Sequence, residues 1–285
     1  MSLLATLDEQ AGRIVRRRNW RRKARRMQSE LDTAYRRAGV RSISQVHQLL
    51  RMLRPHQTGL DLIRVGPDHD GGYILPDDFD GVQALFSPGV DDVIGFDHEI
   101  ADMGIDTHLL DASVEEPSNL RQNMTFSSKF IGPKTEGTFV TMDDWVNQYA
   151  PGTEDLILQM DVEGAEYDVL PTMSDALFNR FRMVIVEYHD LHHAIQPEQY
   201  DKIKASWSRF SRTHSVAHVH INNCAQTLAL HGLSIPTVVE VTYLRNDRLQ
   251  CRTGDEASIP HPLDRLNNPI LPEPQRAEFW RRGIV

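Results

Sequence analysis

Short apolar runs alternate with helix-like stretches through the middle of the chain. The runs that predict strands are Ala84–Phe86, Thr107–Leu110, Thr138–Thr141, Leu156–Met160 and Met183–Val186. The stretches between them predict helices over Gly95–Met103, from Met142 onward and over Gly164–Leu170. Short buried strands separated by helices are typical of a parallel sheet that is covered on both faces. The middle of the chain is therefore expected to be an α/β domain.

The pattern changes after Ser215. Val216–Ile221 and Thr237–Leu244 look like two strands with little helix between them, and an antiparallel pair at the end of the sheet would fit. From Ser258 the chain is rich in proline and is expected to lie along the surface.

A helical arm is predicted ahead of this domain. No proline interrupts the helical pattern from Leu3 to about Arg37, and a second short helix fits Ser42–Leu53. We therefore divide the chain into a basic helical arm (1–55), the α/β domain (56–257) and a proline-rich tail packed on it (258–285).

Arm and body carry opposite charge. Residues 1–55 hold 14 Lys and Arg against four Asp and Glu, a net charge of +10, whereas the rest of the chain has a net charge of −19. The arginines are densest in Arg16–Arg26, which includes Trp20. The arm could pack on its own body or on a second subunit, giving a homo-oligomer, or it could contact an anionic membrane surface. Nucleic acid is the least expected partner, because the acidic body would repel phosphates.

Cysteine usage and hydropathy bear on the compartment. Cys224 and Cys251 form no CxxC pair, and no apolar run approaches the length needed to span a bilayer. A cytoplasmic location is expected, with the arm as a peripheral contact at the inner face of the membrane if it binds lipid.

Polar residues follow the predicted strands, at the edge where an open parallel sheet binds its ligands. They are Ser87, Gly89 and Asp92 after the first strand, Asp111 after the second, Asp161 and Glu163 after the fourth, and Glu187, His189 and Asp190 after the fifth. Each could be a helix cap or a surface acid, but together they indicate a site. Glu166, in the first turn of the next helix, is expected to be a cap.

The glycine turn favours one cofactor over others. Asp111 lies where a carboxylate could accept both ribose hydroxyl protons. Residues 89–95, however, lack both the GxGxxG of dinucleotide sites and the Gly-Lys-Ser/Thr of phosphate loops. Asp91 and Asp92 would repel a pyrophosphate, but they suit a ligand with an ammonium and a sulfonium. This points to S-adenosylmethionine.

Residues 157–166, Ile-Leu-Gln-Met-Asp-Val-Glu-Gly-Ala-Glu, closely resemble the L-K-x-D-I/V-E-G-x-E signature of FkbM-family methyltransferases. Gln159 replaces the usual lysine, and residues 141–144 resemble the family's T-L-D-D turn. Weaker similarity to a bacterial branch associated with surface polysaccharides lies in Arg64–Gly66, Asp70–Tyr73, Ser87–Val90, His218–His220, Asn222–Asn223, Glu240–Tyr243, Leu263–Arg265 and Asn267–Pro269. The resemblance spans about Arg64 to Pro272 and leaves the arm out.

The resemblance implies a class I methyltransferase (Rossmann-like) fold: a mostly parallel sheet with antiparallel C-terminal strands, here preceded by the helical arm. It implies an S-adenosylmethionine-dependent O-methyltransferase that acts on a hydroxyl of a sugar, a polysaccharide or a related small molecule. By position, the cofactor contacts would be Ser87, Gly89, Asp92, Asp97, Asp111 and Asp161. Gly71 and Gly72 would also contact the cofactor, in a loop that they form with Asp70 over the pocket.

Removing the acceptor's proton requires a base or a metal. His189 or His220 is our candidate base, since a histidine pKa of about 6.5 suits neutral pH, and Glu187 is a further catalytic candidate. Strand alternation puts Glu187 with His189, and His218 with His220, on shared faces. Asp161, Glu187 and His189 are also candidate ligands of a divalent metal such as Mg²⁺ or Mn²⁺.

Two other functions compete with this interpretation. A non-catalytic methyltransferase fold could serve as a scaffold in polysaccharide assembly, and Pro88 in the cofactor turn keeps that alternative open. A nucleic-acid methyltransferase could use the basic arm. However, Asp161-Val162-Glu163-Gly164 stands where such an enzyme would carry an Asn/Asp-Pro-Pro-Tyr/Phe turn.

Overall fold

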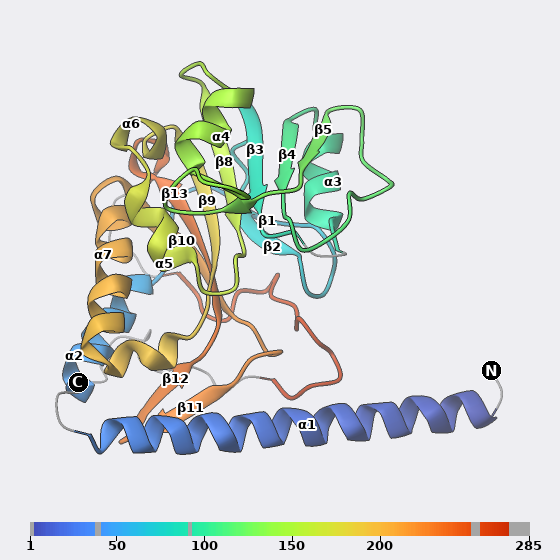
Figure 1. The fold of residues 1–285 in the computed structure, drawn as a ribbon, viewed down its shortest axis with the longest axis vertical. Coiled ribbons are helices and arrows are strands. Elements are labelled where there is room, and N and C mark those ends of the chain that lie inside the picture. The colour runs from blue at the N-terminus through green and yellow to red at the C-terminus, as the bar shows by residue number, and fades with distance from the viewer. Residues whose placement is uncertain (1–2, 38–40, 91–92, 252–256, 274–285) are drawn as a thin grey trace.

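A seven-stranded sheet forms the centre of the computed structural model, which describes residues 3–37, 41–90, 93–251 and 257–273 (Figure 1). The strand order is β10-β13-β9-β8-β3-β4-β5. The strands are β3 (Val82–Pro88), β4 (Asp106–Leu110), β5 (Met124–Ser127), β8 (Asp155–Met160), β9 (Phe181–Tyr188), β10 (His214–Ile221) and β13 (Val239–Arg245). β13 is antiparallel to both of its neighbours, whereas β9, β8, β3, β4 and β5 pair in parallel. The predicted mostly parallel sheet is confirmed.

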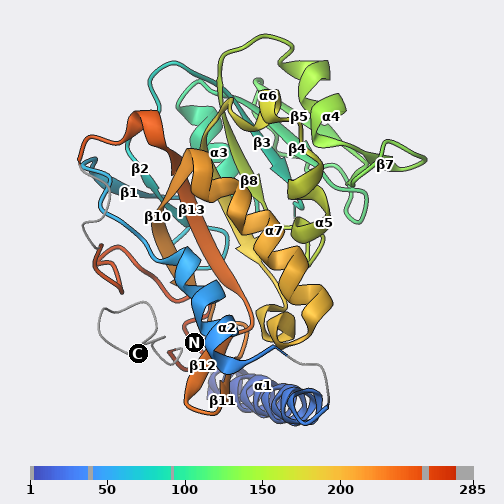
Figure 2. The ribbon, with the colours of Figure 1, turned by 90° about the vertical axis from the view of Figure 1, so that its left-hand side faces the viewer.

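Both faces of the sheet are buried, as its continuous apolar strands require. Leu156 and Leu158 of β8 belong to one hydrophobic cluster, whereas Ile157 between them belongs to another on the opposite face. The helices that follow the strands are α3 (Gly95–Asp102), α4 (Met142–Tyr149), α5 (Glu166–Val169), α6 (Asp175–Phe178) and α7 (Pro197–Thr213). α4, α5, α6 and α7 contribute to the first cluster and α3 to the second, so the two helix layers lie on opposite faces (Figures 1 and 2).

Most of the predicted elements form, with one strand reduced. The predicted strand at Thr138–Thr141 shrinks to β7 (Phe139–Val140), which pairs with β6 (Phe130–Ile131) outside the main sheet. Phe139 is 46% exposed, so this segment lacks the burial that would hold a longer strand. The expected C-terminal pair is confirmed as β10 and β13, and the hairpin β11 (Thr227–Leu230) and β12 (Leu233–Pro236) lies between them.

The N-terminal arm is helical, as predicted. α1 (Leu3–Tyr35) runs along one edge of the molecule, where its C-terminal half packs against β11 (Figure 1). α2 (Ile43–Leu50) begins at a capping box between Ser42 and Gln45 and buries Val46, Leu49 and Leu50 in the core. The short 3₁₀ turns are Arg51–Leu53, Leu170–Thr172, Leu191–Ile195 and Asn246–Arg248.

The hairpin β1 (Leu62–Val65) and β2 (Tyr73–Pro76) covers one face of the main sheet, with Val65, Tyr73 and Leu75 in the second hydrophobic cluster. The described part of the tail, residues 257–273, packs on the domain. Asn223 and Asn268 exchange hydrogen bonds of 2.8 Å that fasten it there. Within the described ranges, no helix is long and apolar enough to cross a membrane.

Candidate active site

A cavity of about 520 Å³ opens at the carboxyl ends of the central strands, the edge where the sequence predicts the site. Six carboxylates line it, from elements far apart in the chain: Asp70, Asp97, Asp111, Asp161, Glu163 and Glu187. The other polar lining residues are Lys23, Tyr73, Ser87, Ser113, Gln159, His189, Asn222 and Cys224. The cavity is therefore strongly acidic.

Gly89 lets the ends of β3 and β8 come together. Its φ is +86°, and a Cβ on this residue would lie 1.5 Å from the backbone oxygen of Asp161. Its N–H donates to the carbonyl of Leu110 at the end of β4 (3.0 Å). A glycine is thus required for the close approach of three strand ends, which is a physical reason for the turn that the sequence shows.

Gln159 stands where a lysine was expected, and the structure gives it a definite role. The Ser87 hydroxyl donates to Gln159 Oε1 (2.7 Å), and Gln159 Nε2 donates to the Tyr73 hydroxyl (3.1 Å). All three side chains are buried. This chain of hydrogen bonds joins β3, β8 and β2 beneath the cavity, so the uncharged side chain fixes the cavity floor.

Two of the predicted cofactor residues present carboxylates to the cavity. Burial raises the pKa of Asp97 to about 6, and its Oδ1 is buried without a hydrogen-bond partner among the described residues. Asp111 follows β4, and its Oδ1 accepts bonds of 2.6 Å from both the backbone N–H and the hydroxyl of Ser113. Asp111 is thereby oriented at the rim, as a ribose contact would need.

His189 and Glu166 form a dyad beside the cavity. Glu166 is completely buried, and its Oε1 lies 2.8 Å from His189 Nδ1. This bond turns the other ring nitrogen, Nε2, toward the carboxylates of Glu163 (3.5 Å), Asp161 (3.7 Å) and Glu187 (3.9 Å). Burial lowers the pKa of His189, but Glu166 and the other carboxylates outweigh that effect and raise it to about 9.

Glu166 is more than the helix cap that its sequence position predicts. Its Oε1 does accept the N–H of Gly164 (3.2 Å) at the start of the helix. The same oxygen also holds His189, and no part of the side chain is exposed. Sequence position gave no sign of this second contact, because residues 166 and 189 meet only through the pairing of β8 with β9.

Glu187 and His189 lie on one side of their strand end, as alternation predicts, and both line the cavity. Asn222 Nδ2 donates to Glu187 Oε1 (2.8 Å). Burial and the neighbouring acids raise the pKa of Glu187 well above its usual value, and burial is the main cause that raises the pKa of Asp161 to about 7. Protons are therefore retained among these carboxyl groups at neutral pH.

The structure brings most of the predicted site residues together. Gly71, Ser87, Gly89, Asp97, Asp111, Asp161, Glu187 and His189 all line the cavity. Gly72 and His220 are not among the described residues that line it, and Asp92 lies outside the described residues. Gly72 instead packs within the hairpin loop, where a Cβ would meet the carbonyl oxygen of Pro67 at 2.1 Å.

His220, the other candidate base, lies behind the cavity wall. Its Nδ1 is 3.3 Å from Asp264 and its Nε2 is 3.0 Å from Asn267 Oδ1. His218 shares the face of His220, as predicted, and its Nε2 is 3.0 Å from Asp264. Both ring nitrogens of His220 are thus engaged by the tail, which leaves His189 as the histidine that faces the cavity.

Asn267 links this buried cluster to the cavity. Its Nδ2 donates to Asp70 (2.9 Å) and to Glu240 (2.6 Å), and its carbonyl accepts the N–H of Asp70 (3.1 Å). The tail thereby holds the loop that carries Asp70 and Gly71 over the cavity. The sequence showed these residues as separate pieces and gave no sign that they pair.

The metal prediction involves the same groups. Asp161 and His189 of the predicted set, together with Glu163, offer ligand atoms that all lie within 4.8 Å of one another. The third predicted ligand, Glu187, has a carboxylate oxygen 3.9 Å from His189 Nε2. Asp161 Oδ1 is buried without a hydrogen-bond partner among the described residues, which would suit a ligand. Since the pKa of His189 is about 9, a proton would have to leave before its ring could bind an ion. A metal at this place stays a prediction.

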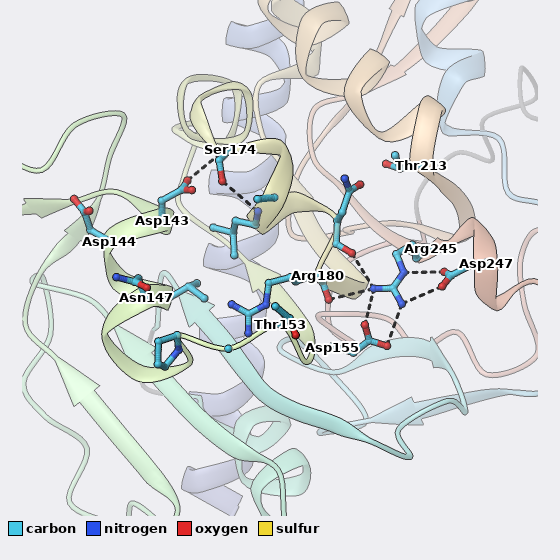
Figure 3. A pocket seen from close by; sticks show the side chains of 16 residues that line it. Asp143, Asp144, Asn147, Thr153, Asp155, Ser174, Arg180, Thr213, Arg245 and Asp247 are labelled. Carbon is cyan, nitrogen blue, oxygen red and sulfur yellow. Dashed lines mark hydrogen bonds and ion pairs between the residues drawn. The ribbon is translucent and has the colours of Figure 1, made fainter.

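A larger cavity, of about 880 Å³, lies at the opposite end of the sheet (Figure 3). Three of its charged groups are paired with one another: Arg245 contacts Asp155 (2.6 Å) and Asp247 (2.7 Å). Arg180 binds the carbonyl of Ala150 (2.8 Å) there. This cavity lies at the amino ends of the parallel strands, away from the edge where an open parallel sheet binds its ligands, so we do not assign the chemistry to it.

A known protein family matches the part of the chain that carries several of these site residues. No curated protein matches the chain. Residues 93–218 match the family model described as the methyltransferase FkbM domain. The matched range includes Asp97, Asp111, Asp161, Glu187 and His189, whereas α1 and the tail lie outside it. Over residues 93–218 the chain is therefore similar to the FkbM methyltransferase domain, which supports a methyltransferase.

Proposed function

We propose that this chain is an S-adenosylmethionine-dependent O-methyltransferase that acts on a hydroxyl of a sugar or a related small molecule. The observation that carries the proposal is the Glu166–His189 dyad, whose free ring nitrogen faces an acidic cavity at the carboxyl ends of the strands. A buried carboxylate that orients a histidine is a recurrent arrangement for removing a proton from a hydroxyl.

The acidic lining suits a cationic cofactor. Asp97 and Asp161 each present a buried carboxylate oxygen that lacks a hydrogen bond among the described residues. A dinucleotide or nucleoside triphosphate would bring its phosphates against these groups, whereas S-adenosylmethionine brings an ammonium and a sulfonium. Asp111, fixed by Ser113, is the candidate for the ribose hydroxyls. When bound, S-adenosylmethionine supplies a methyl group that is activated by its sulfonium.

His189 is the candidate general base. In its neutral form, Nε2 can accept the proton of the acceptor hydroxyl while Glu166 stabilises the imidazolium that forms. The pKa of about 9 means that His189 holds a proton at neutral pH before the ligands bind. A sulfonium held in the cavity would disfavour that second positive charge and would lower the pKa of His189 toward the working range. The cavity walls align the two reactants, which is a large part of the work in methyl transfer.

The proposal is tested with S-adenosylmethionine labelled in its methyl group and a panel of sugars and glycosides as acceptors. We expect wild-type protein to label at least one acceptor on oxygen. His189→Asn should lower kcat about 10²- to 10⁴-fold, the usual contribution of general base catalysis. His69→Asn, an exposed histidine outside the cavity lining, is the matched control and should keep wild-type activity. Full activity in His189→Asn would exclude it as the base.

A further inference from the structure

α1 docks on the rim of the candidate active site. Trp20 Nε1 donates to the carbonyl of Ala225 (3.3 Å), and Ala225 itself lines the cavity. Two turns further on, Gln28 exchanges hydrogen bonds with the backbone of Ala229, at 2.7 Å and 2.9 Å. The helix is therefore anchored beside the cavity by contacts on either side of Lys23.

Lys23 lines the cavity, one helical turn after Trp20. Among the described lining residues it is the one Lys or Arg, set against six carboxylates. The ion pairs formed between described residues do not include it. Lys23, which is itself exposed to solvent, thus adds one cationic side chain to a lining that is otherwise rich in carboxyl groups.

Lys23 lies on the side of the cavity formed by the segment after β10. Asp111 follows β4, the neighbour of the edge strand β5; His189 follows β9, and the segment that carries Ala225 follows β10 at the opposite edge. The hydrogen bond between Trp20 and Ala225 holds α1 against this segment, and Lys23 on the next turn of α1 lines the cavity there. The candidate cofactor contacts and Lys23 therefore lie on opposite sides of the candidate base.

We propose that Lys23 binds an anionic group of the acceptor, a carboxylate or a phosphate, so that the substrate is an acidic or phosphorylated hydroxyl compound. This rests on the proposed function, whose acceptor it specifies. The carboxyl groups of the lining disfavour an anion over most of the cavity, whereas Lys23 at the α1 side would attract one. This favours an orientation in which the charge of the acceptor lies at α1 and a hydroxyl is directed toward His189.

The test measures binding by calorimetry of glucose, glucuronate and glucose 1-phosphate, each with and without S-adenosylhomocysteine. Wild-type protein should bind the two anionic probes about tenfold or more tightly than glucose, as one charge-assisted contact would give. Lys23→Gln should abolish that preference. Arg25→Gln removes the same charge from the same helix at an exposed position outside the cavity lining, and it should keep the preference.

Two results would overturn the proposal. One is an absence of preference in wild-type protein, including undetectable binding of all three probes. The other is a preference that survives in Lys23→Gln. S-adenosylmethionine affinity is measured in parallel and should not change in Lys23→Gln; a matching loss there would assign Lys23 to the cofactor carboxylate instead. If wild-type protein fails to bind S-adenosylmethionine, the proposed function fails, while the probe series without cofactor still reports on Lys23.

Discussion

His189 owes its character to residues that are distant in sequence. Glu166 is completely buried and can be stabilised as an anion by two hydrogen-bond donors, His189 Nδ1–H and the backbone N–H of Gly164. Holding this charge next to the ring raises the pKa of His189 to about 9, against the lowering effect of burial. One pair of side chains thus sets both the direction of Nε2 and the pH at which it can accept a proton.

A pH profile follows from this pair. Since the neutral imidazole is the base, kcat/KM should rise with pH through neutrality and level off near pH 9 in wild-type protein. Glu166→Gln removes the charge that raises the pKa, so the plateau should begin at lower pH, closer to the ordinary histidine value of about 6.5. Steady-state methyl transfer from pH 6 to 10 measures both curves. Superimposable profiles would show that Glu166 does not control the base.

At the level of elements, β10 and the tail form one unit. His218 and His220 of β10 enclose Asp264 of the tail, and all three are largely buried. Burial alone would raise the pKa of Asp264, but the two histidines outweigh it and hold this pKa well below its usual range. The pKa of His220 is raised to about 9, because Asp264, Glu240 and Asn267 outweigh the effect of its burial.

Asp264→Asn should therefore destabilise the protein at pH 6 by about 3 kcal/mol, because it leaves a buried positive charge without its partner. The Asp264 contribution is present above the unfolded pKa of about 3.9 and is lost as pH falls below it. The His220 contribution is complete below about pH 6.5 and is lost as pH rises through about 9, so the mutational effect should shrink above that pH. Urea unfolding at pH 6 and pH 10 measures the mutational effect on either side of the His220 pKa. Asp68→Asn, at an exposed carboxylate, is the control; equal losses in the two variants would contradict the account.

Sequence patterning predicts the elements better than the contacts between them. The buried strands of the sheet are readable because Leu156–Met160 and Met183–Val186 are continuous apolar runs with neighbouring turn signals. The β1–β2 hairpin was missed, since Leu62–Val65 is only half-buried and contains Arg64. The pairing of His220 with Asp264 leaves no local signal, because it depends on a tail that returns across the sheet.

The same limit applies to the site. The acids after the strands could be predicted because the carboxyl ends of parallel strands must meet at one edge. The contribution of Lys23 could not, because helical periodicity alone does not say which turn of α1 faces the cavity. That is decided by the contacts of Trp20 and Gln28 with residues more than 200 positions away.

On the scale of the whole molecule, some side chains of α1 contact the body and others are exposed. Trp20, Lys23 and Gln28 contact the body or its cavity. Arg21, Arg22 and Arg25 are exposed, and the helix extends along one edge of the molecule (Figure 1). The positive charge of the arm is thus displayed at one edge of a body that carries the opposite charge.

This arrangement leads us to propose that the arm binds anionic membrane surfaces. Sedimentation with phosphatidylglycerol vesicles should capture the protein, phosphatidylcholine vesicles should not, and added salt should weaken capture. Reversing charge at Arg21, Arg22 and Arg25 should abolish capture, whereas the same change at the exposed Lys129 and Lys134 should not. Equal binding to both lipids would argue against a membrane role, and tighter binding to nucleic acid than to anionic vesicles would favour the alternative partner.

The central claim is that the acidic cavity binds S-adenosylmethionine, and calorimetry tests it most directly. Wild-type protein should bind one S-adenosylmethionine, and Asp111→Asn should weaken binding about 10- to 100-fold through loss of charge-assisted ribose contacts. Asp106→Asn makes the same change at the exposed start of the same strand and should leave the affinity unaltered. Failure of wild-type protein to bind S-adenosylmethionine would contradict the account and favour a non-catalytic scaffold. Equal affinity in Asp111→Asn would show that the cofactor does not lie where we place it.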